Sequence, residues 1–205
     1  MVAMYFVGAG SLMALAFAAC MFVRVRREPG GNPEMLRISG AVQKGANAYL
    51  RRQYNGVGIF FAAVFVILLV MAFCGFLSFF TPFAFLTGGF FSGLSGFIGM
   101  RTATMANCRT AQVSSRNLNK GLRVAFSAGS VMGFTVVGLG LLDLTVWYFI
   151  LNMAFGALPE SQRIAQITAN MLTFGMGASS MALFARVGGG IFTKAADVGA
   201  DLVGK

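Results

Sequence analysis

The sequence predicts an all-α fold, a polytopic helical membrane protein with about five transmembrane helices. Hydrophobic residues make up 57% of its 205 residues and charged residues only 11%. Soluble domains carry about 25% charged residues, so this composition is typical of a membrane protein. The sequence also contains five apolar runs, each long enough or nearly long enough to cross a hydrocarbon core of about 30 Å.

The apolar runs give approximate bounds for the spans, which we expect at residues 2–23, 56–80, 83–104, 123–151 and 164–190, with a helix end at 191–205. The first run is predicted to be a retained span and not a signal peptide, because no basic residue precedes it and arginines follow it. Residues 34–54 carry apolar side chains at three- and four-residue steps, which predicts an amphipathic helix continuing into the second span. Pro82 suits the start of the third span, where its missing N–H costs nothing.

Small residues recur on one face of the third and fourth spans. They are Ser92, Gly96, Gly99 and Ala103 in the third span, and Ala125, Gly129 and Gly133 in the fourth. Stripes of small residues let helices approach closely in lipid. We therefore expect these two faces to pack against other helices.

Basic residues lie almost wholly on one side of the predicted spans. They fall before residue 56, between 100 and 124, and after 185, whereas the loop after the fourth span carries only Glu160 and Arg163. The positive-inside rule then predicts that the N-terminus lies outside and that residues 191–205 lie in the cytoplasm. We expect the membrane to be a prokaryotic cell (inner) membrane, with its lipid in contact with the helices. This retention of basic loops accounts for the net charge of +10, and no nucleic-acid partner is expected, because stacking aromatic residues are not interleaved with the basic ones.

The C-terminal segment contains the charged residues that are best suited to bind a ligand. If residues 193–205 are helical, Lys194, Asp197, Asp201 and Lys205 lie at steps of three and four on one face. The two aspartates repel each other unless a divalent cation lies between them, and lysines beside them could hold an anion. This pattern predicts a site for Mg²⁺ and a phosphate ligand. A solvated helix end with balanced charges is the open alternative.

Further polar groups lie within or beside the spans. Arg186 falls where the fifth span meets water, and Ser179 lies seven residues earlier on the same face. The two could form part of an ion route, or Arg186 could simply extend its charge to the interface. Asp143 is a carboxylate inside the fourth span with no evident basic partner, which makes it a functional hypothesis. The glycines at 188–190 fit a flexible break, a close helix crossing or a phosphate nest.

Residues 199–205 match the phosphate-binding loop pattern G-x-x-x-x-G-K. A true loop of this kind follows a β-strand and is completed by Ser or Thr. Here a membrane helix precedes the pattern and the sequence stops before the deciding residue. We therefore expect no such loop.

Four segments resemble the membrane-bound, ion-translocating pyrophosphatases. The most specific is residues 188–205, GGGIFTKAADVGADLVGK, which resembles the signature of that family. Residues 45–54 (GANAYLRRQY), 99–110 (GMRTATMANCRT) and 124–133 (VAFSAGSVMG) are also similar to family segments. The resemblance extends over nearly the whole chain.

The resemblance implies hydrolysis of pyrophosphate to two phosphates coupled to pumping of H⁺ or Na⁺, by a homodimer that uses Mg²⁺ and, in some members, K⁺. Lys194 and Lys205 would bind pyrophosphate, Asp197 and Asp201 would bind the metal and act in catalysis with Lys194, and Arg186 with Ser179 would belong to the ion gate. Lys44 stands where the family usually has an acidic residue, with little effect expected on the chemistry. Family members are several times longer, so residues 1–205 would form only the N-terminal part of the pyrophosphatase domain, inactive alone.

Two other functions stay open from the residues alone. One is a small non-hydrolytic membrane transporter or scaffold. Its charged stripe, formed by Lys194, Asp197, Asp201 and Lys205, would bind an anion or a partner. The other is a membrane protein with a nucleotide-hydrolysing domain that begins at Gly199 and continues past Lys205.

Overall fold

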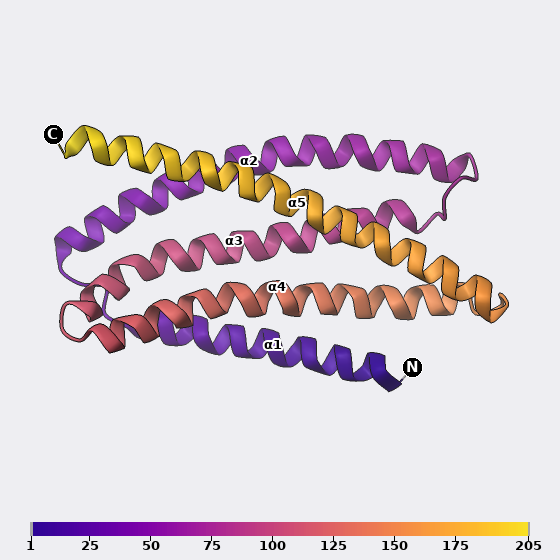
Figure 1. Ribbon diagram of the computed structural model, residues 1–205, viewed down its shortest axis with the longest axis horizontal. Coiled ribbons are helices and arrows are strands. Elements are labelled where there is room, and N and C mark those ends of the chain that lie inside the picture. The colour runs from indigo at the N-terminus through magenta and orange to yellow at the C-terminus, as the bar shows by residue number, and fades with distance from the viewer. Residues whose placement is uncertain (1, 205) are drawn as a thin grey trace.

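The computed structural model describes residues 2–204, which form five long helices joined by short turns (Figure 1). Their bounds are α1 (Val2–Arg27), α2 (Pro33–Phe73), α3 (Thr81–Ser114), α4 (Leu118–Ala154) and α5 (Glu160–Val203). No strand occurs between residues 2 and 204. The all-α prediction is confirmed, and residues 34–54 do belong to one helix with the second apolar run.

Local sequence explains where the helices begin. The side chain of Asn32 caps α2 by accepting a hydrogen bond from the Met35 amide at 2.8 Å, and Asn117 caps α4 by accepting from the Lys120 amide at 3.0 Å. Asparagine is among the preferred residues at this position because it satisfies an amide that has no partner in the first turn. Pro82 lies in the first turn of α3, as predicted.

The second helix ends earlier than the apolar run does. α2 stops at Phe73, before the expected end at residue 80. Gly75 adopts a φ of +81°, a left-handed conformation that glycine adopts readily and that terminates a helix. Residues 74–80 therefore form the turn into α3, although most of them are apolar.

The third helix lies at the centre of the bundle. It packs against α2, α4 and α5, while α1 packs mainly on α4. In Figure 1, α1, α3 and α4 run side by side, and α5 runs diagonally across α3 toward the C-terminal end of α4. The end of α1, the α3–α4 connection and the C-terminal end of α5 all lie at the left of that view, opposite the N-terminus.

The tightest helix contacts occur at glycines outside the predicted small-residue stripes. A Cβ on Gly88 would collide with the Phe174 carbonyl, and one on Gly177 with the Phe85 carbonyl, so α3 and α5 touch through their backbones. Gly99 of the predicted stripe does face a helix, since its Cβ would lie 2.7 Å from Met132. Gly129 has no described atom within 4 Å of such a Cβ, so no described helix covers this face of the fourth span at that position.

Helices α1 to α4 are long and apolar enough to cross a membrane by length and composition. Within the described residues α5 does not meet the same measure. Polar side chains such as Asn170, Thr173 and Ser179, together with several glycines, lower its hydropathy. Asn170 is fully buried and accepts a hydrogen bond from the Thr81 hydroxyl at 3.0 Å, which links α5 to α3. Part of the polarity of α5 therefore belongs to side chains that form hydrogen bonds inside the bundle.

Candidate functional site

The charged stripe lies on the last turns of α5. This helix is continuous from Glu160 to Val203, so it passes through the glycines at 188–190 without a break. The side chains of Lys194, Asp197 and Asp201 are all exposed. They lie at helical steps of three and four, so they share one face, as the spacing predicts.

Lys194 and Asp197 contact each other directly. The Lys194 Nζ donates a hydrogen bond to Asp197 Oδ2 at 3.4 Å, and the side chains are 83% and 57% exposed. An ion pair this exposed adds little to stability, because water screens the charges. Both groups are therefore free to exchange this contact for a ligand.

The donor set suits a cation that is shared with a substrate. No group of three His, Cys, Asp or Glu residues that could hold a metal exists among the described residues. Asp197 and Asp201 supply two carboxylates one helical turn apart, and Mg²⁺ is usually bound by one or two carboxylates together with substrate phosphates. The residues thus fit Mg²⁺ bound with a phosphate ligand, and they do not form a closed metal cage. Lys205, the second predicted lysine, lies outside the described residues.

Residues 184–192 of α5 pack against the first half of α2. The Gln53 amide donates a hydrogen bond to the Phe184 carbonyl at 2.6 Å, and the Tyr49 and Phe192 rings have centroids 5.4 Å apart. A Cβ on Gly188 would collide with Gln53, so this buried glycine allows the close approach. Of the three interpretations of residues 188–190, the structure favours the close helix crossing at Gly188.

Sequence reasoning did not identify Tyr49 and Gln53 as residues that position the site. Their segment was noted for its amphipathic helical pattern and for its likeness to a family segment, and neither residue carries a recognisable chemical pattern. Tyr54 adds a third link, since its hydroxyl donates a hydrogen bond to the Gly93 carbonyl of α3 at 2.7 Å. Together these side chains fix the height of the charged stripe relative to the rest of the bundle.

Arg186 and Ser179 both lie on the exposed face of α5. Arg186 forms no ion pair within the described part of the chain, where the two salt bridges are Arg37–Glu34 and Lys194–Asp197. The structure places both residues on the side of α5 that no described helix covers. It therefore brings neither into contact with Asp197 or Asp201.

Asp143 is the buried carboxylate of α4. Its side chain is only 4% exposed, and its Oδ2 atom has no hydrogen-bond partner among the described residues. No basic side chain lies within ion-pair distance of it in that part of the chain. It lies far from the charged stripe in sequence and on a different helix, so the structure does not join it to the candidate site.

The fold and the site together define a class: a helical integral membrane protein with a lysine and two aspartates on a helix end, suited to a metal-bound phosphate ligand. The chain belongs to the family described as inorganic H⁺ pyrophosphatase, whose model matches residues 12–205. The nucleotide-hydrolysing and scaffold alternatives are not supported by this match.

Relatives from three bacteria are similar over nearly the whole chain. One from Bacteroides thetaiotaomicron, whose name contains the words pyrophosphate-energized sodium pump, is 54% identical over 205 residues, 98% of this chain. A K⁺-insensitive pyrophosphate-energized proton pump of Moorella thermoacetica is 43% identical over 96% of the chain. A K⁺-stimulated pyrophosphate-energized sodium pump of Thermotoga maritima is 38% identical over 95%. The matched region covers only 28%, 27% and 27% of these relatives.

Proposed function

We propose that the complete protein to which these 205 residues belong hydrolyses pyrophosphate to two phosphates and couples this reaction to transport of H⁺ or Na⁺. The observation that carries the proposal is the charged stripe at the end of α5. Lys194 and Asp197 are exposed and in contact with each other, and Asp201 follows on the same face. The stripe lies inside the region that the family model matches.

Each stripe residue has a distinct role in this proposal. Lys194, with Lys205 as a second cation, binds the oxygens of pyrophosphate. Asp197 and Asp201 would hold Mg²⁺, and the ion would supply positive charge to neutralise the phosphate groups. In the substrate complex, Lys194 exchanges its contact with Asp197 for a phosphate oxygen. A positive group held at that place stabilises the charge that develops on the leaving phosphate.

The exposed face of α5 is the place where the remainder of the protein completes the site. Ser179, Arg186 and the stripe residues all lie on that face, and polar side chains at membrane depth are costly unless they line a protein interior or an aqueous path. The relatives are several times longer than this chain, which spans 28% or less of them. Further helices packed on this face would supply the carboxylates that activate water, and would make Arg186 and Ser179 part of an ion gate.

The basic ends of the helices support an orientation. Arg24, Arg26 and Arg27 occupy the last turn of α1, and the α3–α4 connection and the end of α5 lie at the same end of the bundle (Figure 1). From the positive-inside rule we propose that this end faces the cytoplasm and that the N-terminus lies outside. The membrane we propose is a prokaryotic cell membrane. Relatives named as sodium pumps and as proton pumps both match the chain, so the pumped ion and any K⁺ stimulation are to be measured. A homodimer is the assembly proposed for the complete protein.

The test is phosphate release from Mg²⁺–pyrophosphate by membranes that contain the complete protein, with and without K⁺. We expect Lys194→Ala to abolish release, because the substrate loses its positive contact. The matched control is Lys44→Ala, which removes another exposed lysine from the same end of the bundle and is expected to leave release unchanged. Undiminished release by Lys194→Ala would refute the assignment of the site.

A further inference from the structure

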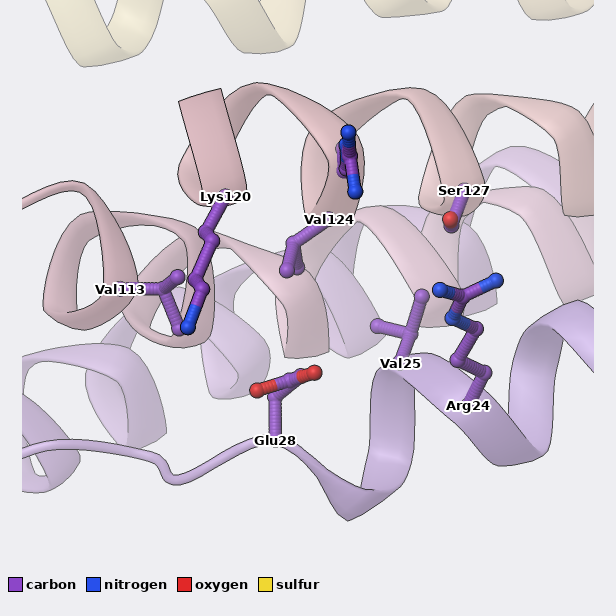
Figure 2. Close-up of a pocket in the computed structure, with 8 residues that line it drawn as sticks. Arg24, Val25, Glu28, Val113, Lys120, Val124 and Ser127 are labelled. Atoms are coloured by element: carbon purple, nitrogen blue, oxygen red, sulfur yellow. The ribbon is translucent and has the colours of Figure 1, made fainter. Parts of the chain in front are cut away.

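A second charged site lies away from the stripe, at the junction of α1 and α4. A cavity of about 270 Å³ opens between the end of α1 and the first turns of α4. Its charged and polar lining consists of Arg24, Glu28, Lys120, Arg123 and Ser127. In Figure 2 the side chains of Arg24 and Glu28 extend from the α1 side, and those of Lys120 and Ser127 come from α4, toward the same space.

The charges in this cavity are unbalanced. Arg24, Lys120 and Arg123 supply three positive groups, and Glu28 supplies one negative group, so the lining has a net charge of +2. None of the three basic groups has a carboxylate within 4.0 Å among the described residues, where the two ion pairs lie elsewhere. Basic side chains that converge without partners favour an anion with several acceptor oxygens, such as a phosphate group.

The floor of the cavity is part of the packed core. Val25 and Val124 line it, are 1% and 7% exposed, and belong to one buried cluster with Ala106 and Ala128. The positions from which the basic side chains extend are therefore fixed by helix packing. A loop rearrangement is not needed to form the site.

A groove with both polar and apolar lining continues from the charged cavity along α4, toward Ser130. A second cavity of about 360 Å³ shares Arg24, Arg123 and Ser127 with the first and extends past Leu122 and Phe126. Leu122 and Phe126 are 55% and 69% exposed. The charged end lies at the expected membrane boundary, since the predicted spans end at residue 23 and begin at residue 123. The groove thus begins at charged side chains at head-group depth and continues past the exposed apolar side chains of Leu122 and Phe126.

We propose that this cavity and groove bind an anionic phospholipid, with its phosphate group held by Arg24, Lys120 and Arg123 and the start of an acyl chain lying against Leu122 and Phe126. Basic pockets between helices on the cytoplasmic side recognise anionic head groups. A free phosphate would engage only the charged end and would leave the rest of the groove unused. The site lies on α1 and α4, whereas the proposed pyrophosphate site lies on α5, so the two proposals are independent.

The test is retention of phosphatidylglycerol by the complete protein, purified in detergent and examined by native mass spectrometry. Each basic residue near an anionic lipid strengthens binding about fivefold, so Arg24→Gln with Arg123→Gln is expected to weaken retention about 30-fold. The control is Arg26→Gln with Arg116→Gln, which removes the same charge from exposed positions outside the cavity. The control is expected to retain the lipid as the unaltered protein does.

Two further measurements separate the occupants. Ser127→Trp fills the cavity without changing its charge, and we expect it to remove the lipid. This variant keeps the proposal testable if Arg24→Gln with Arg123→Gln folds poorly. Competition with inorganic phosphate distinguishes a phospholipid site from a site for free phosphate. The proposal is overturned if the double variant retains phosphatidylglycerol normally, if phosphatidylcholine binds equally well, or if inorganic phosphate alone displaces the lipid at millimolar concentration. It is also overturned if a later helix of the complete protein fills the groove.

Discussion

The contact between α3 and α5 can be tested at a single glycine, Gly177. A Cβ on this residue would collide with the Phe85 carbonyl and would lie 2.9 Å from the Phe85 carbonyl carbon and 3.2 Å from the Gly89 amide nitrogen. Non-bonded heavy atoms prefer separations of about 3.5–4.0 Å, so Gly177→Ala must push the two helices apart by about 1 Å. The obstacle is backbone and not a flexible side chain, so it cannot rotate away.

The size of the effect follows from two opposing contributions. Overpacking a helix contact costs about 1–3 kcal/mol, and we expect the upper part of that range here. Alanine in a helix is favoured over glycine by about 0.5–1 kcal/mol, which offsets some of the loss. Gly175→Ala is the matched control, because a Cβ at Gly175 meets no described atom within 4 Å and gains only the helix preference.

The assay can use the single tryptophan of the sequence. Trp147 is 7% exposed and packs in the cluster that includes Ala84 of α3 and Phe174 of α5. Its fluorescence should therefore report separation of α3, α4 and α5 when the folded chain in mild detergent is titrated with sodium dodecyl sulfate. We expect Gly177→Ala to unfold at lower detergent fraction than the unaltered chain, and Gly175→Ala to unfold at the same or higher fraction. Equal stability of the two variants would refute the backbone contact.

Three further predictions follow from the same structure. Asp143→Asn should unfold at the same or a higher detergent fraction, because it removes a buried carboxylate whose Oδ2 has no described partner; a large loss of stability would mean that the carboxylate has a partner. Gln53→Leu should lower the free energy of unfolding by about 1 kcal/mol, because it deletes the hydrogen bond to the Phe184 carbonyl. Gln43→Leu is the control and should change the free energy less, because it loses only a hydrogen bond to Ser39 within α2. The 205 residues alone should release no phosphate from Mg²⁺–pyrophosphate, and turnover by this purified chain would show that its own residues suffice.

Much of the architecture follows from the sequence because long apolar runs leave few alternatives in a membrane. The all-α prediction is confirmed, and one helix does contain both the amphipathic residues 34–54 and the second apolar run. The end of that helix was placed wrongly because apolar residues continue past Phe73 and only the backbone of Gly75 marks the stop. A hydropathy pattern contains no information on backbone dihedral angles, so it could not predict where this helix ends.

The contacts between helices were less predictable. A list of small residues cannot distinguish Gly129, which faces open space, from Gly177, which touches a neighbouring backbone, because the difference depends on where α5 crosses α3. The charged stripe was found because its spacing lies within one helix. The side chain of Gln53 was missed because its partner is more than a hundred residues away, and Arg24 and Arg123 were not linked for the same reason.

The most direct test of the proposed pump is transport by the complete protein in sealed proteoliposomes. Pyrophosphate and Mg²⁺ are added outside, and entry of H⁺ is followed with a pH-sensitive dye and entry of Na⁺ with the radioactive isotope. We predict that one of these ions accumulates only while pyrophosphate is hydrolysed, and that Lys194→Ala stops both processes together. Hydrolysis without ion entry, or ion entry that continues in Lys194→Ala, would contradict the account.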